Sequence, residues 1–216
     1  MKLITIFLSA FMLLSSVAAI ADATQDFKQL QKRWAEVNYT LKDKAQQEVF
    51  EELVIQADKA TESHPDSAEV LIWSGIIKSS FAGAKGGLGA LSLAKASKAD
   101  LEKAITINDT ALAGSAYTSL GTLYFKVPGW LLGFGKDKKA KELLEKALTI
   151  NPDGIDSNYF YAEFLADQRL YDEAEKYLLK AQQAPARPDR PLADKGRHDD
   201  INSSLQNVRT KLASKK

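Results

Sequence analysis

The chain has 216 residues, of which 45% are hydrophobic and 26% charged, so it can form one well-buried domain of ordinary soluble composition. Its formal net charge is +1, which gives no electrostatic case for binding nucleic acid or an anionic membrane surface. The absence of cysteine excludes both a disulfide framework and a thiol-linked lipid anchor.

Residues 1–21 have the pattern of a signal peptide. Lys2 gives a positive tip, an apolar run extends from Leu3 to Leu14, and Ala19-Ile20-Ala21 matches a cleavage site. The alternative is an uncleaved transmembrane anchor, for which this run is short. We therefore expect cleavage after Ala21, no membrane insertion afterwards, and a bacterial protein that is periplasmic or secreted. The removed segment carries one lysine and no acid, so the mature chain has 28 basic and 28 acidic residues.

Residues 22–67 are expected to form an N-terminal helix pair. Apolar side chains recur at steps of three and four residues from Phe27 to Leu41 and again from Val49 to Ala57, so each segment has one apolar helix face. A short turn near Lys42 separates the two helices. Pro65 ends the pair, because a residue that precedes proline disfavours helical backbone.

Three further helix pairs are expected, and they share one sequence plan. The second helices align on a Leu-x-Lys-Ala pattern that ends at Ala104, Ala147 and Ala181. In the first helices a small residue, Gly121 or Ala162, lies opposite a small residue of the second helix, which lets the two axes approach closely. The pairs occupy residues 68–109, 114–152 and 155–184.

Two of these pairs contain long insertions between their helices. In the first pair, helices are expected over 68–80 and 90–107, with the glycine-rich segment 81–89 as a loop. In the second pair, the segment 127–135 contains Pro-Gly and is rich in aromatic residues. After the last pair, residues 185–197 form a proline-rich connection, and residues 198–216 form a C-terminal helix.

This plan resembles the tetratricopeptide repeat (TPR), most fully in residues 155–184, which include Tyr171-Asp-Glu-Ala174. The Pro128-Gly-Trp130 loop before a Lys-Lys-Ala140 helix, and the helix 158–164, are also similar to the T-component family associated with TRAP transporters. That resemblance covers about residues 68–212 of the chain. It implies a periplasmic helical protein that partners a substrate-binding protein of a secondary transporter. Members of that family are lipoproteins, and this chain lacks the cysteine for such an anchor.

The predicted fold is all-α: a TPR-like right-handed superhelix of antiparallel helix pairs, with long intra-repeat insertions and a C-terminal capping helix. The predicted function is that of a periplasmic, non-catalytic scaffold for protein–protein interaction. The alternative is an accessory component of a TRAP-type transporter that acts with a periplasmic substrate-binding protein and binds a small apolar ligand. The sequence leaves the oligomeric state open.

Catalytic, metal and cofactor sites are not expected. The two histidines, His64 and His198, belong to no metal-ligand or nucleophile pattern. The glycine-rich segment 83–89 lacks the Gly-Lys-Ser/Thr ending of a phosphate-binding loop, and no strand precedes it. We interpret this segment as a helix connection.

The candidate binding residues lie on the concave face of the first helices and in the 127–135 insertion. The insertion is too apolar for a solvated loop, since burying each large side chain is worth about 1.5–3 kcal/mol. Its apolar residues are therefore expected to be covered, either by folding back onto Phe81 and Leu88 or by lining a partner or ligand surface. The candidates are Ile72, Ile76, Thr122, Phe125, Lys126, Tyr159 and Glu163 on the helices, and Trp130 and Phe134 in the loop.

Overall fold

The computed structural model describes residues 22–214, so the expected signal peptide lies outside the described residues. Residues 22–40 form a helix, and residues 22–214 contain no β-strand. The helices that follow are α2 (Asp43–Ser63), α3 (Ala68–Lys85), α4 (Gly87–Ile107), α5 (Ala111–Lys126), α6 (Asp137–Ile150), α7 (Ile155–Asp167), α8 (Tyr171–Gln182) and α9 (Pro191–Ala213).

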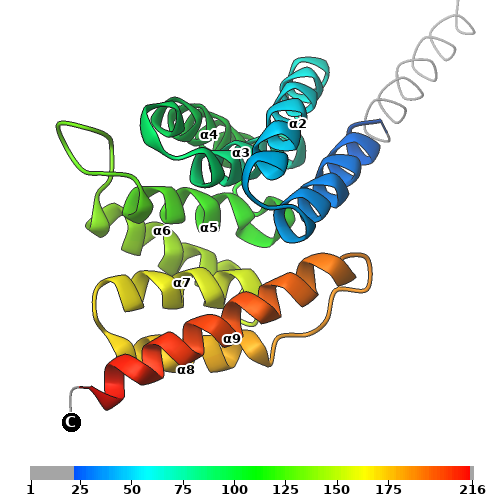
Figure 1. Cartoon of the computed structure of the whole chain (residues 1–216). Helices are drawn as coiled ribbons and strands as arrows, with labels where there is room; N and C mark the ends of the chain where they lie inside the picture. Colours follow the sequence, from blue (N-terminus) through cyan, green and yellow to red (C-terminus); the bar gives the residue numbers. More distant parts are fainter. Residues whose placement is uncertain (1–21, 215–216) are drawn as a thin grey trace, which may run out of the picture.

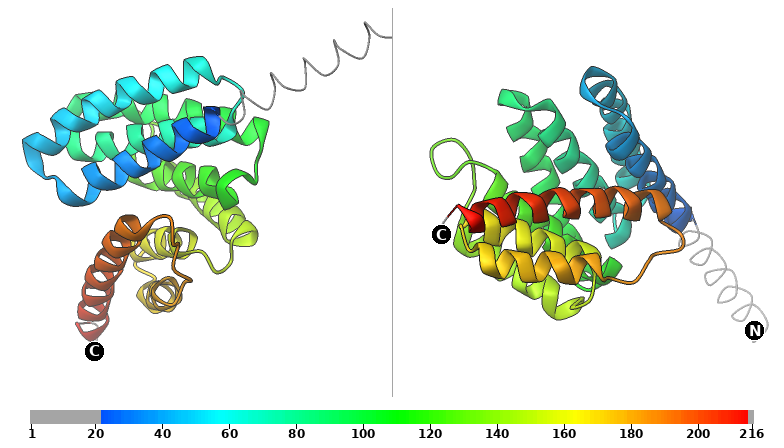
Figure 2. Two further views of the ribbon diagram at one scale, coloured as in Figure 1. Left: turned by 90° about the vertical axis from the view of Figure 1, so that its right-hand side faces the viewer. Right: turned by 60° about the horizontal axis from the view of Figure 1, so that its bottom comes forward.

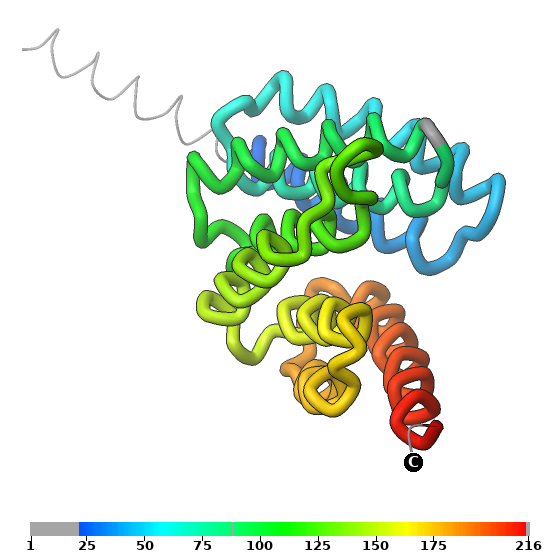
Figure 3. Tube along the Cα trace, turned by 90° about the vertical axis from the view of Figure 1, so that its left-hand side faces the viewer, coloured from blue at the N-terminus to red at the C-terminus, as the bar shows by residue number. Residues whose placement is uncertain are grey.

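The helices are arranged as stacked pairs, with the most extensive contacts between α3 and α4, α5 and α6, and α7 and α8 (Figure 1). The expected all-α, TPR-like fold is confirmed. Small residues allow the close approach within each pair: Gly75 faces Leu101 of α4, and Gly121 faces Leu144 of α6. Figure 3 follows the chain from the first helices through α5 and α6 to the last pair and α9.

The predicted glycine-rich loop over residues 81–89 is wrong. Helix α3 continues to Lys85 and α4 begins at Gly87, so only Gly86 separates them. The helical conformation persists because Phe81 and Ala82 are buried in the core and hold the last turns of α3 in place. Gly86 has φ +63°, a left-handed conformation that glycine adopts without steric cost. The insertion therefore lengthens two helices instead of forming a loop.

Helix α9 also begins earlier than predicted. The sequence assigned residues 185–197 to an irregular connection, but α9 starts at Pro191. Proline suits the first turn of a helix because its missing N–H would have no partner there. The first turns of α9 are held by burial, with Ala193, Gly196 and Arg197 all buried.

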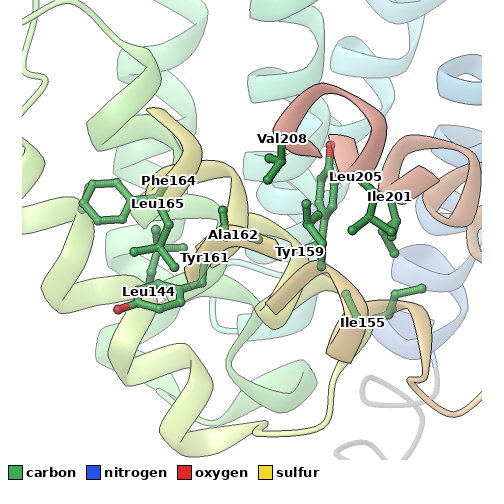
Figure 4. Packing of buried hydrophobic residues seen from close by; sticks show 14 residues of the cluster. Leu144, Ile155, Tyr159, Tyr161, Ala162, Phe164, Leu165, Ile201, Leu205 and Val208 are labelled. Atoms are coloured by element: carbon green, nitrogen blue, oxygen red, sulfur yellow. The ribbon is translucent and has the colours of Figure 1, made fainter. Parts of the chain in front are cut away.

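The end of the chain packs against two different parts of the protein. Ile201, Leu205 and Val208 of α9 join the core cluster of α7, beside Ile155 and Tyr159 (Figure 4). The same helix thus covers the last pair, as the predicted capping helix should.

The beginning of α9 meets the N-terminal helix. Ala193 belongs to the core cluster of Leu30 and Trp34, and Gly196 lies against the ring of Tyr39. The N-terminal helix and the beginning of α9 are therefore in contact, and Figure 2 shows both helices from two further sides. This contact positions the site described next.

One buried cation ties three helices together. Lys78 of α3 lies 2.7 Å from Asp58 Oδ1 of α2 and donates to Asp100 Oδ2 of α4 at 2.6 Å. Ser74 also donates to the Asp100 carboxylate, at 2.8 Å. Because these partners compensate the buried charge of Lys78, the lysine can lie within the helix stack.

Candidate binding cavity

A cavity of about 770 Å³ lies between the N-terminal half of the structure and α7–α9. Its walls come from the N-terminal helix, α3, α4, α5, the 127–135 loop, α7 and the start of α9. Most of the lining is apolar, with Trp34, Trp73 and Ile76 on one side and Leu91 and Leu123 on another. Its volume lies within the usual range of small-molecule sites, about 300–1,000 Å³.

The polar lining of the wall consists mainly of hydroxyl groups. Ser80 accepts a hydrogen bond from Trp34 Nε1 at 2.8 Å. Ser79 and Thr122 donate their protons to backbone carbonyl groups of their own helices. The hydroxyl protons of Ser79 and Thr122 are thus already used, and these two side chains offer the cavity mainly apolar contact and oxygen lone pairs.

One end of the cavity is charged. Asp156 of α7 accepts from Arg197 Nε at 2.8 Å and from Arg187 Nη1 at 2.7 Å. Burial by itself would raise the pKa of Asp156, but the guanidinium groups of Arg197 and Arg187 hold that pKa well below its ordinary range. Asp156 is therefore a carboxylate at neutral pH.

Arg197 is enclosed by aromatic rings as well as by acids. Its guanidinium centre lies 4.4 Å from the ring centroid of Tyr159 and 4.6 Å from that of Phe160, and it donates to Asp200 at 3.0 Å. Burial lowers the pKa of Arg197, and the carboxylate of Asp156 outweighs this and raises it. This arginine is a fully partnered structural cation.

Arg190 differs from the ion-paired Arg187 and Arg197. Its guanidinium lies 5.2 Å from the ring centroid of Trp73, and it has no ion pair with any residue of the described chain. Burial and the positive charge of Arg187 both lower the pKa of Arg190. Arg190 is thus a cation at the cavity wall whose charge is not taken up by a direct salt bridge within residues 22–214.

The 127–135 loop stands at the rim of the cavity and projects from the ends of α5 and α6 (Figure 1). Its base is closed by two backbone hydrogen bonds, from Gly135 N to Pro128 O at 3.0 Å and from Lys136 N to Tyr124 O at 2.7 Å. Phe134 packs edge-on against Tyr124, with ring centroids 5.5 Å apart. The base of the loop therefore folds back onto the helices, in line with one of the two predicted alternatives.

The tip of the loop behaves differently. Trp130, Leu131 and Leu132 are 88%, 83% and 72% exposed, so this chain does not fold the tip back onto itself. The other predicted alternative, that these residues line a partner or ligand surface, stays a prediction. The tip carries Gly129 and Gly133 and turns back at Leu131, whose φ of +87° is uncommon for a residue with a side chain. The three large apolar residues of the tip are thus mostly exposed to solvent, and Leu131 and Leu132 also line the rim of the cavity.

The structure brings only some of the predicted binding residues to the cavity. Ile76, Thr122 and Lys126 line it. Ile72 is fully buried in the core and cannot contact a ligand. Trp130 lies in the exposed tip of the loop.

The other predicted residues serve the packing around the cavity. Phe125 packs against Phe164, with ring centroids 5.7 Å apart, and Phe134 against Tyr124. Tyr159 is buried beneath Arg197, and Glu163 accepts a hydrogen bond from Ser204 at 2.7 Å.

Sequence reasoning missed the charged end of the cavity and its two tryptophans. Trp34, Trp73, Asp156, Arg190 and Arg197 come from four segments that are far apart in the sequence, and repeat spacing carries no signal for their meeting. The one available hint was the density of arginines at 187–197, which we interpreted only as part of an irregular connection.

Comparison with known proteins agrees with this architecture. A family model described as tetratricopeptide repeat matches residues 131–195. The comparison with curated proteins gives no match. The chain is thus a TPR-like helical-repeat protein, a fold that typically serves as a protein-binding scaffold.

Several solved structures show a distant similarity. Two structures of MamA share 18% and 17% identity, with 80% and 87% of this chain and 94% of each of those chains covered, and both have a TM-score of 0.44. The pilF protein of Pseudomonas aeruginosa shares 16% identity over 91% of this chain and 99% of its own, with a TM-score of 0.36. With these values, nothing about the site is inferred from these proteins.

Residues 22–214 lack two features that are typical of other protein classes. No helix there combines the length and the apolar character that crossing a membrane requires. In the same range, no group of three or more histidine, aspartate or glutamate residues is arranged to hold a metal ion.

Proposed function

We propose that this protein is an exported, non-catalytic scaffold that docks a partner protein through the tip of the 127–135 loop. The observation that carries this proposal is the exposure of three consecutive large apolar residues, Trp130, Leu131 and Leu132. Covering each of them would contribute about 1.5–3 kcal/mol. A contiguous apolar patch of this kind is typical of a protein-interaction site.

The construction of the loop supports the same proposal. Its base is held by the Gly135–Pro128 and Lys136–Tyr124 hydrogen bonds, so the conformation of the loop is restrained before any partner binds. A restrained loop loses less conformational entropy on binding than an unrestrained one. Tryptophan is also the residue type most enriched among interface residues that dominate affinity. The partner is accordingly a protein with an apolar pocket that takes Trp130, flanked by the two leucines.

Site-specific photo-crosslinking in the producing cell tests this proposal. A photoreactive amino acid at position 130 is expected to give one dominant crosslinked protein, whereas the same group at the exposed Lys138 of α6 is not. The crosslinked protein is then identified and purified. Its affinity is measured against wild type and against Trp130→Ser/Leu131→Ser.

The double substitution is expected to weaken binding at least about thirtyfold, since central apolar residues of an interface contribute about 2 kcal/mol or more. Ile55→Ser is the matched control, because Ile55 is a 53% exposed apolar residue on α2 outside the cavity and should leave affinity unchanged. Equal affinity of the loop variant would refute the proposal. Crosslinks only to lipid would assign the tip to a membrane surface, and crosslinks only between copies of this chain would assign it to self-association.

A second candidate function is that of an accessory component of a TRAP-type transporter, acting with a periplasmic substrate-binding protein. The observation that favours it is the 770 Å³ cavity, which is deep enough to hold a small ligand as well as to receive a protein. Co-expression with a periplasmic TRAP-type substrate-binding protein of the same organism, followed by size-exclusion chromatography, tests this candidate. Independent elution of both proteins, with and without transported solute, would contradict it.

A further inference from the structure

Two buried donors at the cavity wall have no acceptor in the described chain. Trp73 is 2% exposed, yet its Nε1–H meets no hydrogen-bond acceptor among residues 22–214, and the same holds for the Nε–H of Arg190. Leaving a buried donor unsatisfied costs about 1–3 kcal/mol, and more for a charged group. Both residues line the cavity, and the guanidinium of Arg190 lies 5.2 Å from the Trp73 ring centroid. The two donors thus belong to one region.

The other tryptophan and arginine side chains near the cavity, unlike Trp73 and Arg190, do have hydrogen-bond acceptors for these donors. Trp34 also lines the cavity, but its Nε1–H donates to Ser80 at 2.8 Å. Arg187 and Arg197 share the carboxylate of Asp156, and Arg187 also pairs with Asp194. Asp156 and Asp194 are therefore already engaged by other arginines. The unused donors of Arg190 and Trp73 call for an acceptor, and the charge of Arg190 favours one that is negative.

The rest of the cavity would suit an apolar body attached to that acceptor. Away from the charged end, the walls are formed by Ile76, Ala90, Leu91 and Leu123, and the leucines of the loop stand at the rim. Besides Arg190 and the fully paired Arg197, the lining contains the cation Lys126, which is 54% exposed on its side chain and lies 3.9 Å from Glu163. Its exposure to water makes it a weaker anchor than the partly buried Arg190.

We propose that the cavity binds a small amphiphilic anion, with an oxyanion head that accepts hydrogen bonds from Arg190 and Trp73 and an apolar chain that lies between α3, α4 and α5. A carboxylate and a phosphate monoester share the required head chemistry. This inference deepens the second candidate function, in which the cavity holds a small ligand, and it is independent of the protein partner at the loop.

Calorimetric titration of the purified protein, stripped of bound lipid on a hydrophobic resin, tests the inference without any substitution. Decanoate is the carboxylate probe, decyl phosphate the phosphate probe, and decanol the neutral probe with the same chain. At least one of the two anions is expected to bind at least about tenfold more tightly than decanol, because a hydrogen bond to a charged group adds that much. The stronger of the two anions identifies the head group.

Substitutions then locate the head. Arg190→Gln is expected to weaken anion binding at least about tenfold and to leave decanol binding unchanged. Trp73→Phe keeps an aromatic side chain but removes the five-membered ring with its N–H donor, so it should weaken anion binding severalfold. The matched controls are Trp34→Phe, because the Nε1–H of Trp34 is already used by Ser80, and Lys126→Gln, which removes the exposed cation of the lining. Unchanged thermal unfolding midpoints show that each variant is folded.

The outcomes separate this inference from the functions it accompanies. If decanol binds as tightly as both anions, or if Lys126→Gln rather than Arg190→Gln abolishes the preference, the assignment of the anionic head is wrong while the cavity remains a ligand site. If none of the three probes binds, the cavity is not a site for small amphiphiles, and both this inference and the small-ligand part of the second candidate fail. Neither result bears on the proposal that a partner protein docks at Trp130.

Discussion

Replacing Asp156 by asparagine is expected to lower the free energy of unfolding by about 3 kcal/mol, because one carboxylate neutralises two arginines. Its oxygens accept from Arg197 at 2.8 Å and from Arg187 at 2.7 Å. Arg197 is only 7% exposed, so water cannot replace the lost partner. Asparagine keeps the shape of the side chain and removes the charge, which leaves Arg197 with Asp200 as its one remaining carboxylate at hydrogen-bond distance.

Urea unfolding at pH 7 measures the effect of this substitution. Asp199→Asn is the matched control, because Asp199 belongs to the same charged region but is 64% exposed and pairs with the exposed Lys195. An exposed pair of this kind is worth about 0–1 kcal/mol, so the control should change little. Equal losses in the two variants would show that the Asp156 cluster contributes no more than an ordinary surface ion pair.

The same residue predicts the direction of a pH effect. Since the folded-state pKa of Asp156 is lowered, its contribution to stability is complete above the unfolded-state pKa, about 3.9, and is lost as the pH falls through the folded-state value. The contribution of Asp200 to stability has the opposite pH dependence, because burial raises the pKa of Asp200 in the folded state. The difference in unfolding free energy between wild type and Asp156→Asn is therefore expected to shrink below about pH 4. A constant difference between pH 7 and pH 3 would contradict this explanation.

Alanine at Gly121 is expected to cost about 1–3 kcal/mol, because it separates α5 from α6. A Cβ atom at this position would lie 2.7 Å from Leu144 Cγ and 3.2 Å from the carbonyl oxygen of Ala140. Leu144 is fully buried and its Cγ is close to the backbone, so it cannot move aside without disturbing the core. The helices must therefore separate, or the rotamer of Leu144 must change.

Gly83→Ala is the matched control for this steric effect. Gly83 is also helical, but a Cβ atom there would have no neighbour within 4 Å among the described residues. Alanine at this position should stabilise the protein by up to about 1 kcal/mol, because it reduces the freedom of the unfolded chain and suits a helix. Thermal and urea unfolding of both variants compare the same chemical change in two environments. If Gly121→Ala is as stable as Gly83→Ala, the close approach of α5 and α6 does not depend on the missing side chain.

Much of the fold could be read from local patterns. Apolar residues at steps of three and four identified the helices, and the repeated small residues identified which helices pair. These features depend on neighbours within one or two turns, or on the adjacent helix. The prediction was wrong at residues 81–89 and 191–197, where glycine and proline suggested irregular structure. In both places burial of neighbouring residues, such as Phe81 and Ala193, outweighs the local preference for a break.

Less of the site than of the fold could be predicted from the sequence. The repeat pattern identified Ile76, Thr122 and Lys126, because the inner face of the first helices follows from helical spacing. It could not indicate that Trp73 and Arg190 would lie together, since they are separated by more than half of the chain and belong to no common repeat. For Trp130 it left two alternatives open, because apolar character predicts burial somewhere and does not say whether this chain or a partner provides the cover.

The sequence by itself thus determined the helices, their pairing and the presence of an unusually apolar loop, all of which follow from periodicity and side-chain size. Only the tertiary structure decided that α9 meets the N-terminal helix, with Gly196 against Tyr39, and that a cavity with an unpaired Arg190 lies behind this contact. The physical reason is that helix formation is governed by interactions a few residues apart. A cavity and its charges depend instead on how segments far apart in the chain fill the space between them.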